Sequence, residues 1–176
     1  MRLLSIVKNV FWWLWVVPLG SHADVLVDVT ATMVVPACNI RSENSSSPLK
    51  IGFNRVNLEN LNNTEVVKDF SLYISGCNFS NELAILLNPK EGSTLLYNGK
   101  NILATSTKGL GIDFKDITGE TVRPLEMGKK QRIYPERIEA TLYRMSIQAQ
   151  LVSAIPVNQL EQGKFTSTVT LSVTYN

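Results

Sequence analysis

The sequence predicts an all-β fold in which two antiparallel sheets pack face to face. Seven or eight short segments alternate apolar and polar residues with a period of two, which is typical of strands with one buried and one solvated face. Turn-forming residues separate these segments at roughly regular spacing. The chain of 176 residues is long enough for one domain with its own core, and it contains no internal repeat or second domain.

Residues 1–23 are predicted to be a signal peptide outside that core. Arg2 and Lys8 supply positive charge, and an almost unbroken apolar run at 10–19 precedes small residues at 21–23. A membrane anchor is the alternative, but this run of about ten residues is far short of the roughly 20 that span a bilayer. We therefore expect the mature chain to begin at Asp24.

Removal of this segment changes the inventory of functional groups. It takes away His22, the only histidine, and all three tryptophans. It also takes away Arg2 and Lys8, so that the 17 basic residues fall to 15 and balance the 15 acidic ones. A neutral mature chain gives no support to a basic face that would bind nucleic acid.

Two cysteines remain, Cys38 and Cys77, and in an exported chain they predict one disulfide. By the chain-entropy model, closing a loop of this length would stabilise the fold by roughly 4 kcal/mol. A metal site is the alternative, but it would need more ligands than two thiols in a mature chain without histidine.

The mature chain opens with an alternating segment at 24–36 that predicts a strand of about a dozen residues. Its apolar face consists of Val25, Val27, Val29, Ala31 and Met33, continued by Val35. An ordinary first strand of the sandwich is one interpretation, and Pro36 would end it or confine it to an edge.

Further strands are predicted along the middle of the chain, at 49–53, 67–77, 83–87, 102–104, 110–114 and 132–154. Residues 83–87 are apolar at every position, as expected of a central strand. Good helix formers at 135–149 allow a helix there as an alternative. Strands of this number and spacing favour a sandwich of the immunoglobulin type.

Five interruptions are predicted between or within these strands. Gly76 shifts the phase of its strand and suggests a bulge, and a similar slip occurs near 142–143. Asn98-Gly99 is a signal for a tight hairpin turn, and 116–119 is expected to reverse the chain. A polar loop is expected at 41–48.

The clearest alternation lies in 163–176. One face carries Phe165, Val169, Leu171, Val173 and Tyr175, and Gly163 breaks the pattern at its start. The sequence printed here stops with Asn176, so no later hairpin partner is expected for this apolar strand. Its far edge therefore needs a cover from elsewhere.

No arrangement of residues in the mature chain predicts a catalytic site. It lacks an imidazole base, and its cysteines are expected to bond to each other. Asp113, Asp116 and Glu120 lack the spacing of a calcium loop and are interpreted as solvated turn residues. The basic cluster at 129–132 is interpreted as an exposed loop. We expect no enzyme, no metal, no cofactor and no small-molecule substrate.

The two ends of the chain together resemble a bacterial pilin of the chaperone–usher pathway, close to the minor tip subunits of P-type pili. The C-terminal signature is the penultimate Tyr175, the alternating apolar face before it, and Gly163 fourteenth from the end. The N-terminal signature is Ala-Asp-Val-x-Val-x-Val followed by Val-Pro-Ala-Cys38. The stretches at 68–77, 101–105 and 110–114 are also similar, so the resemblance covers the mature chain.

The resemblance implies an incomplete immunoglobulin-like sandwich that lacks its seventh strand and is completed by donor-strand exchange. In such proteins a periplasmic chaperone first fills a groove beside the final strand, and the N-terminal extension of the next subunit then replaces it. Residues 24–36 would be the donor extension and 37–176 the pilin domain. Basic residues of the chaperone would hold the carboxylate of Asn176.

The expected function is that of a structural minor subunit or adaptor of an adhesive pilus, exported through the periplasm to the cell-surface fimbrium. Its partners would be a periplasmic chaperone, an outer-membrane usher and neighbouring pilins. The alternatives are a single-domain adhesin module that binds a host ligand, and a pilus-terminating subunit. A secreted eukaryotic immunoglobulin-like domain would normally carry a core tryptophan between its cysteines, and none lies between Cys38 and Cys77.

Overall fold

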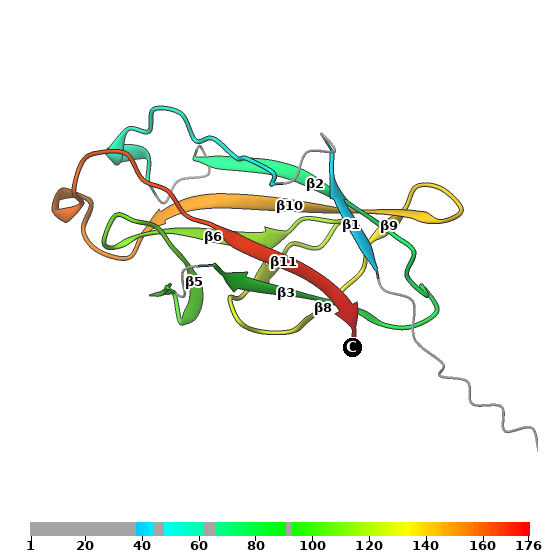
Figure 1. Ribbon diagram of the computed structural model, residues 1–176. Helices are drawn as coiled ribbons and strands as arrows, with labels where there is room; N and C mark the ends of the chain where they lie inside the picture. Colours follow the sequence, from blue (N-terminus) through cyan, green and yellow to red (C-terminus); the bar gives the residue numbers. More distant parts are fainter. Residues whose placement is uncertain (1–37, 44–47, 62–65, 91–92) are drawn as a thin grey trace, which may run out of the picture. The chain divides into compact units, whose positions relative to one another are not determined.

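A computed structural model describes residues 38–43, 48–61, 66–90 and 93–176 of the chain (Figure 1). The chain divides into two compact units, Met1–Met33 and Val34–Asn176, and every described residue belongs to the second. The predicted signal peptide at 1–23 and the predicted donor strand at 24–36 lie outside the described residues and stay predictions. Within the described part, no helix is long or apolar enough to cross a membrane.

The larger of two sheets has eight strands, and its central path runs β1-β2-β10-β6-β5-β4 (Figure 1). All its ladders are antiparallel, and β7 and β9 extend it by pairing with β6 and β10. The strands are β1 (Asn39–Ser42), β2 (Val67–Ser75), β4 (Thr94–Tyr97), β5 (Lys100–Ala104), β6 (Leu110–Asp116), β7 (Arg123–Leu125), β9 (Glu136–Arg137) and β10 (Leu142–Ser153).

The smaller sheet has the order β11-β3-β8, with β3 (Leu83–Pro89) between β8 (Gln131–Ile133) and β11 (Val169–Tyr175). Two short 3-10 helices, η1 (Leu58–Asn60) and η2 (Val157–Gln159), are the helical elements of the described residues. The predictions of an all-β chain and of a central strand at 83–87 are confirmed.

One hydrophobic core joins the two sheets. Its fully buried members include Ile74 and Met145 from the larger sheet and Ile85 and Leu87 from the smaller one, each with 0% of its surface exposed. Alternation places these side chains on the inner faces, because successive residues of a strand point to opposite sides. The two antiparallel sheets therefore form the predicted sandwich.

The turns follow the local chemistry of the sequence. Asn98 and Gly99, at φ +48° and +80°, join β4 to β5 in the left-handed geometry that a two-residue hairpin requires. The predicted reversal after Asp116 leads into β7, which pairs back onto β6. Gly76 also has a positive φ, +73°, but it follows the last residue of β2, so the predicted bulge within the strand is wrong.

Three other predictions need correction. The residues alternating at 49–53 keep an alternating burial but form no ladder, so no strand lies there. The helix considered for 135–149 is wrong, because β9 and β10 form an antiparallel hairpin in that region. The bulge expected at 142–143 is instead the start of β10, and the amides of Ile138 and Glu139 donate to the carbonyl of Leu142 to close the hairpin at 2.9 and 3.1 Å.

Candidate functional site

The final strand, β11, lies at the edge of the smaller sheet (Figure 1). It pairs with β3 in one antiparallel ladder that runs from Val169 opposite Pro89 to Tyr175 opposite Leu83. Among the described residues it has no strand partner on its other side. Apart from the carbonyl of Tyr175, to which Lys130 donates, the backbone groups along that side can pair with another strand.

The side chains of β11 divide into two sets, as its alternation predicts. Thr170, Ser172 and Thr174 are exposed. The other set packs against the main core but stays only half-buried, and it consists of Val169, Leu171, Val173 and Tyr175. An apolar face that contacts the core yet keeps exposed area can bury more surface if a further apolar element covers it.

The segment before β11 departs from the predicted strand. Gly163 is exposed, and Phe165 is half-buried against a second apolar cluster, with its ring centroid 6.5 Å from that of Phe53. The ladder starts only at Val169, because Ser167 occupies the apolar parity and its hydroxyl donates to the carbonyl of Ala104 at 2.6 Å. This segment thus crosses from the end of β5 to the smaller sheet.

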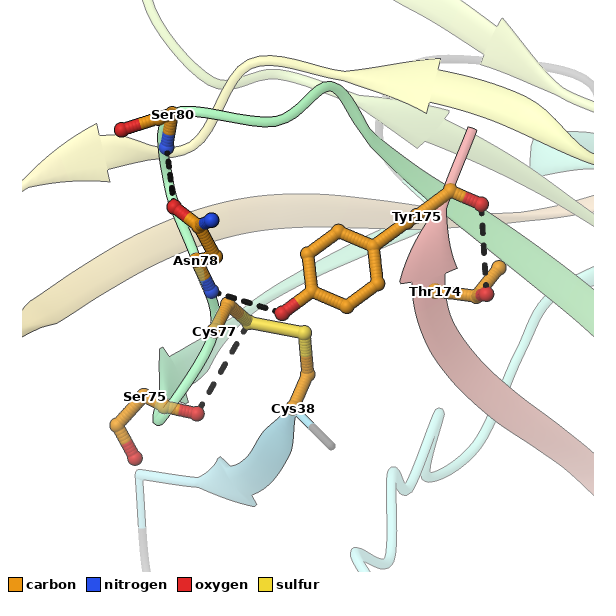
Figure 2. Close-up of a disulfide and its surroundings, with 7 residues drawn as sticks. All are labelled: Cys38, Ser75, Cys77, Asn78, Ser80, Thr174 and Tyr175. Carbon is orange, nitrogen blue, oxygen red and sulfur yellow. Dashed lines mark hydrogen bonds between the residues drawn. A yellow bond between two sulfur atoms is a disulfide. The ribbon is translucent and has the colours of Figure 1, made fainter. Parts of the chain in front are cut away.

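The predicted disulfide between Cys38 and Cys77 is present, and its Cα atoms lie 4.6 Å apart. It joins the residue before β1 to the loop after β2. The phenolic oxygen of Tyr175 accepts a hydrogen bond of 2.7 Å from the amide of Asn78, which follows Cys77 (Figure 2). The penultimate residue of the chain thereby fixes the end of β11 to the loop that carries the disulfide.

The side chains of the basic cluster at 129–132 form hydrogen bonds and an ion pair with nearby residues. Lys130 donates to the carbonyl of Tyr175, and Arg132 forms an ion pair of 2.8 Å with Glu82. Lys129 donates to the carboxylate of Glu126 at 3.2 Å, and this hydrogen bond lowers the pKa of Glu126 below its usual value. These contacts were missed by sequence analysis, which interpreted the cluster only as an exposed loop.

The end of the chain is bonded to the same carboxylate that holds Arg132. The amide of Asn176 donates to the carbonyl of Glu82 at 2.9 Å, and its side-chain amide donates to the carboxylate of Glu82 at 3.3 Å. Glu82 immediately precedes β3, so these bonds extend the β11–β3 ladder by one residue. The register of β11 is therefore fixed at its C-terminal end.

The interpretation of the acidic residues as solvated turn residues is wrong for Asp113 and Asp116, which lie in β6 and are only 4% and 1% exposed. Asp113 pairs with Lys100 at 2.6 Å, while Asp116 accepts from the amide of Thr118 at 2.9 Å and pairs with Arg123 at 3.4 Å. The last pair ties the turn after β6 to β7. Within the described ranges, no group of three acidic, histidine or cysteine side chains is arranged to hold a metal ion.

Comparison with solved structures shows pilus subunits with the same fold. The P pilus adaptor subunit PapF is 20% identical, with a TM-score of 0.55 over 81% of this chain and 98% of that one. The P pilus rod subunit PapA is 12% identical, with a TM-score of 0.53 over 80% and 99% of the two chains. A chain from a chaperone–usher pilus is 14% identical, with a TM-score of 0.54 over 88% and 97%.

These likenesses confirm the predicted fold class, the incomplete immunoglobulin-like sandwich found in pilins. No curated protein matches the chain. A family model described as fimbrial protein matches residues 27–176, which is nearly all of the predicted mature chain. The chain therefore belongs to the fimbrial protein family, and it is a structural subunit of a cell-surface fimbrium reached through the periplasm, not an enzyme.

Proposed function

We propose that the chain is a minor subunit of a chaperone–usher pilus and polymerises by donor-strand complementation. In this proposal β11 is one wall of an acceptor groove, and residues 25–33 of the next subunit supply the missing strand. The observation that carries it is the open edge of β11, whose apolar face contacts the core but remains half-buried. Addition of a strand to such an edge gives backbone hydrogen bonds as well as apolar burial.

The donor segment has suitable side chains for this role. Val25, Val27 and Val29 alternate with polar residues, and Ala31 and Met33 continue the series. Burying four or five such side chains contributes on the order of 10 kcal/mol before the cost of ordering the strand. Donor extensions of this kind usually carry glycine where this chain has Ala31, so the facing acceptor must leave room for a methyl group.

A periplasmic chaperone and an outer-membrane usher are the proposed partners during export. A long apolar edge is an aggregation hazard until a strand covers it, and a chaperone that supplies such a strand removes the hazard. We assign the role of an adaptor or minor shaft subunit, because the chain offers both a donor segment and an acceptor strand and so can link two neighbours. The fold is shared with an adaptor and with a rod subunit, which is consistent with either position in a fibre.

The proposal is tested with the chain from residue 37 onward and a synthetic peptide of residues 24–36. Thermal unfolding and size-exclusion chromatography are measured with and without the peptide. We expect the peptide to raise the melting temperature by more than ten degrees, since several kcal/mol of linked stability correspond to shifts of this size in a small domain.

The matched control is the same peptide with Val27→Asp and Val29→Asp, which preserves length and backbone but places charges on the apolar face. It is expected to leave the melting temperature unchanged. A stable monomer whose melting temperature does not respond to the native peptide would contradict donor-strand complementation.

A further inference from the structure

Only every second residue of β11 directs its backbone groups to the open edge of the smaller sheet. Two hydrogen bonds of 2.9 Å fix the phase, because the amide of Lys90 donates to the carbonyl of Thr168 and the amide of Asn176 donates to the carbonyl of Glu82. In an antiparallel ladder, alternate residues direct these groups to opposite sides, so the residues of even number bond to β3. The residues whose amides and carbonyls face the open edge are Val169, Leu171, Val173 and Tyr175.

At the last of these positions the chain occupies its own edge carbonyl. The ammonium group of Lys130 donates to the carbonyl of Tyr175, and the hydroxyl of Thr174 donates to the same oxygen at 3.4 Å (the second bond is drawn in Figure 2). A carbonyl oxygen has two lone pairs, so an amide of an added strand would have to displace one of these donors. A hydrogen bond from a charged ammonium is stronger than one from a neutral amide, and the exchange is therefore unfavourable.

Both partners of the contact between Lys130 and Tyr175 are held by further bonds. The side chain of Gln131 donates to two carbonyls of the loop that carries Lys130, at 3.0 and 3.1 Å. The amide of Gly128 in the same loop donates to the carbonyl of Leu87 in β3 at 2.8 Å. The hydroxyl of Tyr175 is bonded to the loop after the disulfide. The ammonium group thus lies at one end of the open edge before any strand is added.

A strand that adds to this edge needs a feature that sets its register. A shift by one residue would turn its apolar face to solvent, whereas a shift by two residues would keep every apolar side chain directed inward. The donor segment offers little resistance to the second shift, because Val25, Val27 and Val29 are identical and the next members of the series are also apolar. Side-chain packing alone therefore discriminates weakly between registers two residues apart.

The two ends of the edge limit such a shift in different ways. At the start of β11 the chain leaves the smaller sheet, and the hydroxyl of Ser167 bonds to the carbonyl of Ala104 at 2.6 Å. At the other end the pairing with β3 continues through Asn176, so the strand itself does not end the edge at Val173. The contact from Lys130 does.

We propose that Lys130 is a register-determining residue, which ends the open edge of β11 at Val173 and prevents an added strand from shifting two residues toward Asn176. This inference rests on the proposed addition of a donor strand to β11 and assigns the residue that fixes where the donor stops. Lys130 bonds to a backbone carbonyl of the acceptor strand and not to its apolar face. Its loss should therefore change the register of the donor while leaving the apolar burial in place.

The test reads the register by disulfide cross-linking between the exported chain, as purified from the periplasm, and an excess of a synthetic peptide of residues 24–36. One cysteine is placed on the exposed face of β11 and one on the polar face of the peptide. The substitutions are Thr170→Cys or Ser172→Cys in the chain and Asp28→Cys, Thr30→Cys or Thr32→Cys in the peptide. Because a disulfide requires closely opposed residues, mass spectrometry of the linked products in a redox buffer reports which residues face each other.

With native Lys130, the linked products of the six combinations are expected to fit a single register. Lys130→Met keeps a side chain of similar length but removes the donor. It should raise cross-linking in the combinations shifted by two residues by about tenfold, the factor that corresponds to one hydrogen bond from a charged group. Lys130→Arg retains a charged donor and should restore the single register. Lys129→Met is the matched control, because the ammonium group of Lys129 is paired with Glu126 at 3.2 Å.

The outcomes separate this inference from the proposed function. If Lys130→Met gave the same single register as the native chain, strand addition would stand and the role of Lys130 would be overturned, even if the melting temperature of the variant fell. Several registers in the native chain would overturn that role as well. Absence of cross-links from all six combinations would instead contradict the addition of residues 24–36 along β11, and with it the proposed function.

Discussion

The two neighbouring strands β3 and β11 differ in how much of their apolar surface the chain itself covers. In β3 the side chains of Leu83, Ala84, Ile85 and Leu87 are buried, and strands pair on both sides. In β11 every apolar side chain stays half-buried, and one edge has no strand partner among the described residues. The fold is therefore complete around β3, whereas β11 provides an apolar surface that a second chain can finish.

The largest effect is expected from charges on the donor segment. Val27→Asp together with Val29→Asp should abolish incorporation into fibres, because two carboxylates would have to be desolvated beside the core. Fibre content is measured on the cell surface, and chaperone binding by co-purification from the periplasm. Chaperone binding should survive, since the chaperone would contact β11 and not residues 24–36. Loss of both would refute the assignment of these residues as the donor strand.

A core substitution in β3 should lower the stability of the fold by a similar amount whether or not the donor strand is bound. Ile85→Ala removes a fully buried side chain and is expected to destabilise the fold by about 2–5 kcal/mol. Denaturant unfolding with and without the peptide of residues 24–36 measures this loss, which should be similar in both conditions. A loss that appears only with the peptide would mean that β3 is not independent of the donor strand.

A substitution on the apolar face of β11 should lower the stability more when the donor peptide is bound than when it is absent. Leu171→Ala is expected to cost about 1 kcal/mol without the peptide and about 2–3 kcal/mol with it, since a fuller burial makes the cavity more costly. The same unfolding measurements report the difference. Equal losses in both conditions would mean that no element is added over this face.

The smallest effect is expected at the end of β11. Tyr175→Phe removes the hydroxyl that accepts from the amide of Asn78, while the ring remains, and should cost about 1 kcal/mol. Amide hydrogen exchange at Asn78 measures the result directly and should become faster. Unchanged exchange at that amide would show that the hydrogen bond contributes little to the position of β11.

Sequence patterns predicted those features that depend on local chemistry. Alternation identified the cores of β2, β6 and β11, and Asn98-Gly99 identified the hairpin, because both signals lie within a few adjacent residues. The same alternation at 49–53 gave a wrong strand. Alternation reports which side chains are buried, but it does not report whether a neighbouring backbone is present to form a ladder.

Long-range features could not be predicted in this way. Phe79 and Tyr143 are far apart in the sequence, and only the folded arrangement of the chain stacks their rings, with centroids 3.6 Å apart. The contact of Lys130 with Tyr175 likewise depends on the order of strands in the smaller sheet. The start of β11 was misplaced because Ser167 interrupts the apolar parity, and its effect depends on the carbonyl of Ala104 nearby.

The lengths of the unpaired sheet edges indicate where, and how many times, another chain can pair with this molecule. In the described chain, β11 offers seven edge residues, the part of β2 beyond β1 offers five (67–71), β1 and β4 offer four each, and β8 offers three. Because backbone pairing grows with length, the edge of β11 is the most extensive of these places for a second chain to bind. In the proposed assembly, each unit would accept one neighbour at this edge, and the units would form a linear series without branches.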